Sequence, residues 1–215
     1  MQAAPALFGP AARIDVVGLG AGTLACYARP GQSWTIYEID PAIVAIARDP
    51  KRFSFLSKCL PNVPVVLGDA RLMLARAQAG GADMLVVDAF SSDSVPMHLL
   101  TTEAFATYQR RLAPGGVLMI HISNRYLALE PVLAAAAKEG WSAKIREYEA
   151  SPEARRDNMT SSNWVALTRD AATLDKLVAQ QPALAWRPIV PREGFIGWSD
   201  DYGSILPIIK FRDVK

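Results

Sequence analysis

Short apolar runs alternate with amphipathic segments along most of this chain, and this pattern predicts strands that alternate with helices. The apolar runs predict strands at residues 13–17, 34–39, 63–69, 82–90 and 115–123. The segments that follow them predict helices that begin near residues 22, 41, 71, 102 and 129. Strands that are apolar throughout are typical of a parallel sheet covered by helices on both faces.

The last third of the chain follows a different pattern. Two further strands, at 143–148 and 162–168, are separated by a polar loop and predict an antiparallel pair at the sheet edge. A surface helix is expected over 171–181. We therefore predict one α/β domain over residues 13–215, with a seven-stranded, mostly parallel sheet that ends in an antiparallel edge strand. Residues 1–12 are expected to be a loose lead-in, and residues 182–215 an irregular tail.

Composition narrows the classes of function. The formal net charge of +2 comes from scattered residues, which argues against a nucleic-acid surface. No apolar run approaches the roughly 20 residues that span a bilayer. Cys26 and Cys59 lack CxxC spacing and clustered histidines, so we expect small core residues in a reducing compartment and no metal site. These features favour a cytoplasmic protein.

Three glycines, Gly18, Gly20 and Gly22, follow the first strand at every second position. Such a turn lets the backbone approach a ligand closely and leaves amides free at the start of a helix. Glu38 ends the second strand, where a carboxylate can accept from both ribose hydroxyls. A nicotinamide dinucleotide, an adenosyl ligand and a merely tight turn all remain open on this evidence.

Further details favour an adenosyl sulfonium ligand over a dinucleotide. Thr23 stands where a dinucleotide turn has its third glycine. Asp69 ends the third strand, where its carboxylate can meet an adenine amino group or cap the next helix. Asp88 ends the fourth strand with an acidic loop behind it. Carboxylates attract a cationic sulfonium and repel a pyrophosphate.

The stretches VVGLGAGTLA, YEIDP, LGDAR, VVDAFSSDSVPMHLLT, GGVLMIHISNRYL and WSDDYGSIL together resemble the spermidine synthase-like proteins. The likeness runs from about Arg13 to Lys210, and it is strongest to the branch in which such a domain follows a membrane transporter-like region. The cytoplasmic domain of a membrane protein is therefore the alternative to a free cytoplasmic protein. The resemblance implies a class I methyltransferase-like Rossmann fold that binds decarboxylated S-adenosylmethionine or S-adenosylmethionine, without a metal. It also implies a small amine or polyamine as the substrate.

The resemblance assigns roles to individual residues. It implies Glu38 on the ribose, with Asp69 and the adjoining Ala70 near the adenine. In the family's DSSDP loop, Asp88 matches the first Asp, which helps to deprotonate the amine. Asp93 matches the second Asp, which positions the amine, if two extra residues are allowed for.

Departures from the family pattern keep other functions open. Ala21 stands where the family's turn has an Asp, and only about a dozen residues precede the first strand, where the family has a β-hairpin domain. We expect an aminopropyltransferase. A methyltransferase, or a non-catalytic domain that senses an adenosyl ligand or polyamine for a transporter-like region, is the alternative. A homodimer is left open.

Residues outside these motifs carry weaker expectations. His121 on the fifth strand is expected in the core in preference to the cleft, and His98 is expected to be exposed. Asp200, Asp201 and Tyr202 either close the cleft or dock the tail. Trp198 is expected to be a packing residue.

Overall fold

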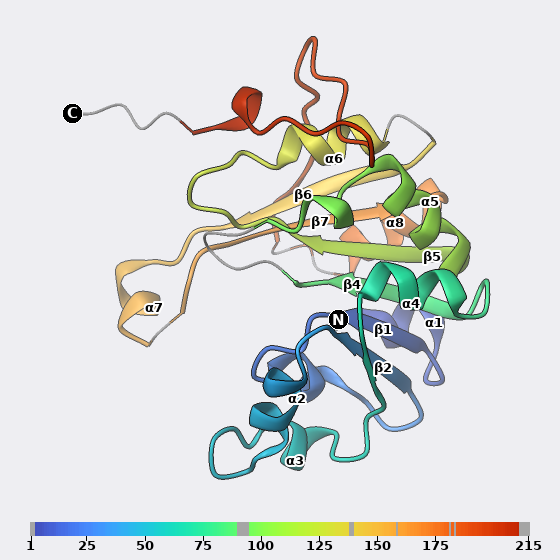
Figure 1. Cartoon of the computed structure of the whole chain (residues 1–215), viewed down its shortest axis with the longest axis vertical. Coiled ribbons are helices and arrows are strands. Elements are labelled where there is room, and N and C mark those ends of the chain that lie inside the picture. Colours follow the sequence, from blue (N-terminus) through green and yellow to red (C-terminus); the bar gives the residue numbers. More distant parts are fainter. Residues whose placement is uncertain are drawn as a thin grey trace.

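The computed structural model describes residues 3–89, 95–137, 140–157, 159–180, 182 and 184–210. In this part of the chain one sheet of eight strands runs through the molecule (Figure 1). The strands are β1 (Arg13–Val17), β2 (Ser33–Glu38), β3 (Val65–Leu67), β4 (Ala82–Val87), β5 (Leu112–His121), β6 (Ser142–Tyr148), β7 (Ser162–Thr168) and β8 (Trp186–Pro188).

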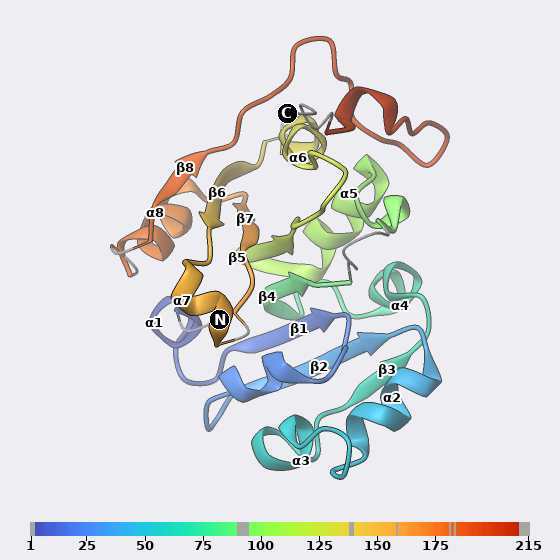
Figure 2. The ribbon, with the colours of Figure 1, turned by 90° about the vertical axis from the view of Figure 1, so that its left-hand side faces the viewer.

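Helices cover both faces of this sheet, with α4 and α5 on one side and α1 and α8 on the other (Figure 2). The α-helices are α1 (Ala4–Phe8), α2 (Pro41–Arg48), α3 (Phe55–Cys59), α4 (Ala70–Arg76), α5 (Thr102–Arg111), α6 (Glu130–Ala137), α7 (Pro152–Arg156) and α8 (Ala171–Ala179). The short 3-10 helices are η1 (Thr23–Tyr27), η2 (Met97–Leu99) and η3 (Leu206–Ile208). None of the described helices has the length and apolar character that crossing a membrane requires.

The strand order is β3-β2-β1-β4-β5-β7-β6-β8. Strands β1 to β5 pair in parallel, whereas β7 is antiparallel to both β5 and β6, and β8 is antiparallel to β6. After β3 the chain crosses to the other side of β1, so the order reverses between β1 and β4. The carboxyl ends of these two strands therefore form the switch point where doubly wound sheets bind ligands.

The predicted strand count of seven is wrong by one. Strand β8 is three residues long and ends at Pro188, so its sequence carries no alternation that could identify it. It forms because it pairs with β6 from Lys144 to Arg146. The mostly parallel sheet with an antiparallel edge, and the glycine turn in its middle, are confirmed.

Alternation along the central strands sends side chains to opposite faces of the sheet. Leu85 and Val87 of β4 pack in the cluster that includes residues of α4, α5 and α6. Met84 and Val86 pack with residues of η1, α2 and α3. Burial on both faces explains why the strand reads as a continuous apolar run.

Two segments are more ordered than the sequence indicates. The lead-in contains helix α1, and Ala3 packs with Leu174 and Leu177 of α8 in a small cluster. The polar loop before β7 contains α7, which Ser151 caps by accepting from the amide of Ala154. After the glycine turn, by contrast, the predicted helix is only the 3-10 turn η1.

A buried ion pair joins the sheet to α5. Arg111 Nε lies 2.6 Å from Asp15 Oδ2 on β1, and only 2% of Asp15 is exposed. The hydroxyl of Tyr37 donates to the same carboxylate at 3.4 Å. Burial, with Asp15 adding to it, raises the pKa of Tyr37 to about 12, so this phenol stays neutral.

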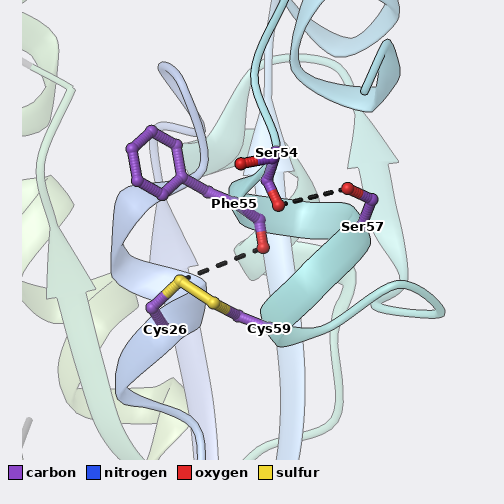
Figure 3. Close-up of a disulfide and its surroundings, with 5 residues drawn as sticks. All are labelled: Cys26, Ser54, Phe55, Ser57 and Cys59. Carbon is purple, nitrogen blue, oxygen red and sulfur yellow. Dashed lines mark hydrogen bonds between the residues drawn. A yellow bond between two sulfur atoms is a disulfide. The ribbon is translucent and has the colours of Figure 1, made fainter. Parts of the chain in front are cut away.

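Cys26 of η1 and Cys59 of α3 form a disulfide, with their Cα atoms 4.8 Å apart (Figure 3). The expectation of two separate core thiols is therefore wrong, because α3 folds back onto the turn that follows β1. The two residues are 33 apart in sequence, so their spacing gave no signal of the pairing. Disulfides persist in oxidising surroundings, so the cysteines no longer favour a reducing compartment.

Candidate functional site

A cavity of about 430 Å³ lies at the switch point, at the carboxyl ends of β1 to β4. Most of the predicted ligand-binding residues line it: Gly18, Gly20, Glu38, Asp69, Ala70 and Asp88. Gly22 is not among the lining residues, and Asp93 lies outside the described residues. The topology thus brings together residues that are up to 70 positions apart in sequence, from Gly18 to Asp88.

The three glycines of the turn have different roles. Gly18 has φ +96°, and a Cβ there would lie 2.4 Å from the carbonyl oxygen of Asp88, so this glycine lets β1 and β4 end side by side. At Gly22 a Cβ would meet Leu56 of α3 at 2.8 Å. A Cβ on Gly20 would meet nothing within 4 Å, and Gly20 borders the cavity. Gly20 is therefore the glycine that leaves room for a ligand.

Glu38 is held rigidly at the end of β2, with 9% of its surface exposed. Its Oε2 accepts from the amide of Leu19 in the glycine turn at 2.9 Å. Its Oε1 accepts from the amides of Ile39 and Asp40 at 2.8 and 3.0 Å. Because each carboxylate oxygen has two acceptor positions, Oε2 retains one for a ligand hydroxyl.

Asp69 caps α4, which is one of its two predicted roles, and it also lines the cavity. Its Oδ1 caps α4 by accepting from the amide of Leu72 at 2.9 Å. Its Oδ2 lies 3.4 Å from Nε2 of His98, which also lines the cavity and has a half-exposed side chain. The capping bond leaves the second oxygen on the side of the cavity.

Asp88 follows β4, and its backbone amide donates to the carbonyl of Val17 at 2.8 Å. Its Oδ1 lies 2.8 Å from Nδ1 of His121, at the end of β5. The prediction that His121 belongs to the core is therefore wrong. The fully apolar strand before it favoured a core position, but β5 continues one residue past the Val87–Ile120 pair that ends β4, and the imidazole lies beside the cavity carboxylate.

The carboxylates that line this cavity give it a negative charge. Among the described lining residues the carboxylates are Glu38, Asp69 and Asp88, and no lysine or arginine is present. Such surroundings favour a cationic ligand and disfavour a pyrophosphate. In the part of the chain that the structure describes, no group of His, Cys, Asp or Glu has the arrangement of a metal site.

The tail docks beside the cavity. Asp200 pairs with Arg71 through both carboxylate oxygens, at 2.6 and 2.5 Å, and accepts from the hydroxyl of Thr101 at 2.9 Å. The Arg71 guanidinium lowers the pKa of Asp200. Trp198 is 2% exposed, as expected of a packing residue, whereas Asp201 and Tyr202 are exposed. Asp200 thus holds the tail and is not a lining residue of the cavity.

A second cavity, of about 530 Å³, lies at the end of β5 and the start of β7, and the sequence did not predict it. Its lining residues come from the end of β5, the loop after it and the start of β7: His121, Ser123, Asn124, Arg125, Thr160, Ser161, Ser162, Asn163 and Trp164. The signal in the sequence was the change from apolar to polar residues at HISN. His121 stands between the two cavities, because it lines the second and bonds to Asp88 of the first.

Solved structures share this fold. A probable spermidine synthase from Corynebacterium glutamicum superposes with a TM-score of 0.60 over 84% of this chain and 67% of that one, at 20% identity. A methyltransferase from Archaeoglobus fulgidus superposes with a TM-score of 0.51 over 77% of this chain and 91% of that one, at 15% identity. The protein therefore has the class I methyltransferase-like α/β fold.

Curated relatives agree with the motifs. A polyamine aminopropyltransferase from Vibrio vulnificus is 34% identical over 125 residues, which are 55% of this chain and 40% of that protein. Putrescine N-methyltransferase 4 from Nicotiana tabacum is 32% identical over 94 residues, 43% of this chain and 24% of that protein. No family model matches the chain. These findings support the likeness to the spermidine synthase-like family, although the chain spans well under half the length of these relatives.

Proposed function

We propose that this protein is a transferase that moves the aminopropyl group of decarboxylated S-adenosylmethionine to a small amine. The observation that carries the proposal is the cavity at the switch point, in which Glu38, Asp69 and Asp88 converge and the described lining residues include no lysine or arginine. The curated aminopropyltransferase relatives support the same reaction. A spermidine synthase with a TM-score of 0.57 to this chain was solved with the transition state analogue AdoDATO.

In this proposal the residues divide the work. Glu38 accepts from the ribose hydroxyls, Asp69 accepts from the adenine amino group beside Ala70, and the open space at Gly20 admits the ligand. Asp88 faces the sulfonium and is the base that helps to deprotonate the amine. Asp93 keeps its predicted role in placing the amine. Most of the rate enhancement then comes from holding the amine nitrogen in line with the carbon–sulfur bond that breaks.

The reaction forms an N–C bond while a C–S bond breaks, and the electron pair stays on sulfur in a neutral thioether. A primary amine with a pKa near ~10.4 arrives protonated at neutral pH, so a proton must be removed before attack. A carboxylate or imidazole within hydrogen-bond reach can accept it.

A second candidate is methyl transfer from S-adenosylmethionine, which the likeness to putrescine N-methyltransferase 4 favours. A third is a sensor without turnover, which Ala21 at the place of the family's Asp favours. The experiment is incubation with each sulfonium donor and a panel of short amines, followed by mass spectrometry of the thioether. Methylthioadenosine from the decarboxylated donor supports aminopropyl transfer, and S-adenosylhomocysteine supports methyl transfer. Binding without either product supports the sensor.

A further inference from the structure

The tail segment 198–204 lies against one wall of the first cavity, the 3-10 helix η2. Trp198 is 2% exposed and packs in the core cluster that includes residues of η2. A Cβ on Gly203 would lie 2.4 Å from the terminal methyl group of Met97, so the tail and η2 are in close contact. The same helix borders the cavity through His98. The tail therefore supports a wall of the candidate site from behind.

One arginine joins the tail to two elements of this wall. Arg71 follows Ala70 at the start of α4, and Ala70 borders the cavity. The Arg71 guanidinium donates to the two carboxylate oxygens of Asp200 at 2.6 and 2.5 Å. Its Nη1 also donates to the backbone carbonyl of His98 at 3.3 Å. Arg71 therefore links α4 to η2, and Asp200 sets the direction of the guanidinium.

The start of α5 fixes Asp200 in turn. The Asp200 carboxylate accepts from the hydroxyl of Thr101 at 2.9 Å, and its backbone amide donates to Glu103 Oε2 at 3.0 Å. The carbonyl of Trp198 accepts from the amide of Thr102 at 3.0 Å. A carboxylate that is held in this way pairs with a guanidinium in one geometry, because the two parallel hydrogen bonds fix both distance and orientation.

The two elements that Arg71 links carry the groups expected at the adenine. Asp69 caps α4, and its Oδ2 lies 3.4 Å from Nε2 of His98 on η2. Both residues line the cavity. A selective contact with one amino group requires the accepting carboxylate and its neighbours to be held to within about 0.5 Å. The distance between α4 and η2 therefore matters for recognition of the base.

We propose that Asp200 is a positioning residue for the recognition of adenine; this rests on the proposed adenosyl ligand. Through Arg71 it holds η2 against α4, which fixes the distance between Asp69 and His98 at the edge of the cavity. A base with an amino group gains a hydrogen bond to the carboxylate of Asp69. A base with a carbonyl oxygen at the same place meets that carboxylate without a proton between them and is disfavoured.

Calorimetry with methylthioadenosine and with methylthioinosine, which has a carbonyl in place of the amino group, tests this selectivity. The unaltered protein should bind methylthioadenosine more tightly. Asp200→Asn keeps the size of the side chain but loses the charge and one acceptor oxygen. It should lower the ratio of the two affinities by about 5–10-fold, the equivalent of one hydrogen bond. Asp201→Asn removes the same charge from the exposed neighbouring residue and is the matched control, with an unchanged ratio expected.

A double-mutant cycle shows whether Asp200 acts through Arg71. In protein that already carries Arg71→Met, Asp200→Asn should have no further effect on the ratio. Arg71→Lys keeps the charge but loses the paired donors, so it should lower the ratio as Asp200→Asn does. An unchanged ratio in both single variants, or equal losses of affinity for the two ligands, would overturn the proposal. If the unaltered protein bound neither ligand, the proposed function would be refuted, and the inference with it.

Discussion

At the scale of single residues, the carboxylates of the candidate site both stabilise the local backbone and border the cavity. Glu38 joins the glycine turn to the end of β2 and keeps one acceptor position for a ligand. Asp69 caps α4 with one oxygen and faces the cavity with the other. The positions of these carboxylates at strand ends were predictable, because a parallel sheet places all such ends at one edge. The contact of His121 with Asp88 was not, since it depends on how far β5 extends past β4.

Glu38→Gln tests the ribose contact. The amide keeps the size of the side chain and one acceptor oxygen, but it replaces the other oxygen with a donor and removes the charge. Affinity for methylthioadenosine should fall by about 1–3 kcal/mol, the range for hydrogen-bonding groups left without partners. Titration calorimetry measures this directly. Glu149→Gln, on an exposed residue outside the cavity lining, is the matched control, and equal affinities in the two variants would remove Glu38 from the site.

At the scale of elements, ion pairs and a disulfide position β8 and α3, which the sequence pattern did not predict. Strand β8 is held by Arg187, which pairs with both oxygens of Glu130 on α6 at 2.6 and 2.9 Å and with Glu147 at 3.0 Å. Helix α3 is tied to η1 by the disulfide. Neither element has a periodic pattern long enough to read, so long-range contacts decide where each forms. Strands β1, β4 and β5, by contrast, could be predicted from their apolar runs alone.

The Glu130 pair predicts a pH dependence. Burial alone would raise the pKa of Glu130, but the Arg187 pair and the amide of Val190 together lower it. A lowered folded-state pKa gives stability that is present above the unfolded value near 4.3 and is lost as the pH falls. Glu130→Gln should therefore cost about 1 kcal/mol at pH 7 and progressively less below about pH 4.

Urea unfolding at pH 7 and at pH 3 measures this difference in the free energy of unfolding. Glu193→Gln, in the exposed tail, is the control. A cost that is the same at pH 7 and at pH 3 would show that the charge of Glu130 does not hold β8.

The disulfide predicts a stability difference between oxidised and reduced protein. Cys26 and Cys59 close a loop across 33 positions, and such a link reduces the freedom of the unfolded chain. Its loss should lower the free energy of unfolding by about 2–4 kcal/mol. Unfolding with and without reductant measures it, and the double variant Cys26→Ser with Cys59→Ser should be insensitive to reductant. Identical curves for the oxidised and reduced protein would contradict the pairing.

At the scale of the whole molecule, the fold was largely readable from the chain. Burial on both faces produces continuous apolar strands, and helices between them require parallel pairing and right-handed crossovers. The switch point between β1 and β4 follows from this topology and locates the first cavity. The second cavity was not readable, because it is built by an antiparallel strand, β7, that lies next to β5 only after folding.

The rate of thioether formation in the unaltered protein and in Asp88→Asn decides whether the cavity at the switch point is a transferase site. Asparagine keeps the shape of Asp88 but loses the charge that attracts the sulfonium and orients His121. We predict transfer by the unaltered protein, a rate lower by roughly 10²–10⁴-fold in the variant, and little change in methylthioadenosine affinity. Transfer at the full rate by Asp88→Asn would show that the Asp88 carboxylate takes no part in the reaction.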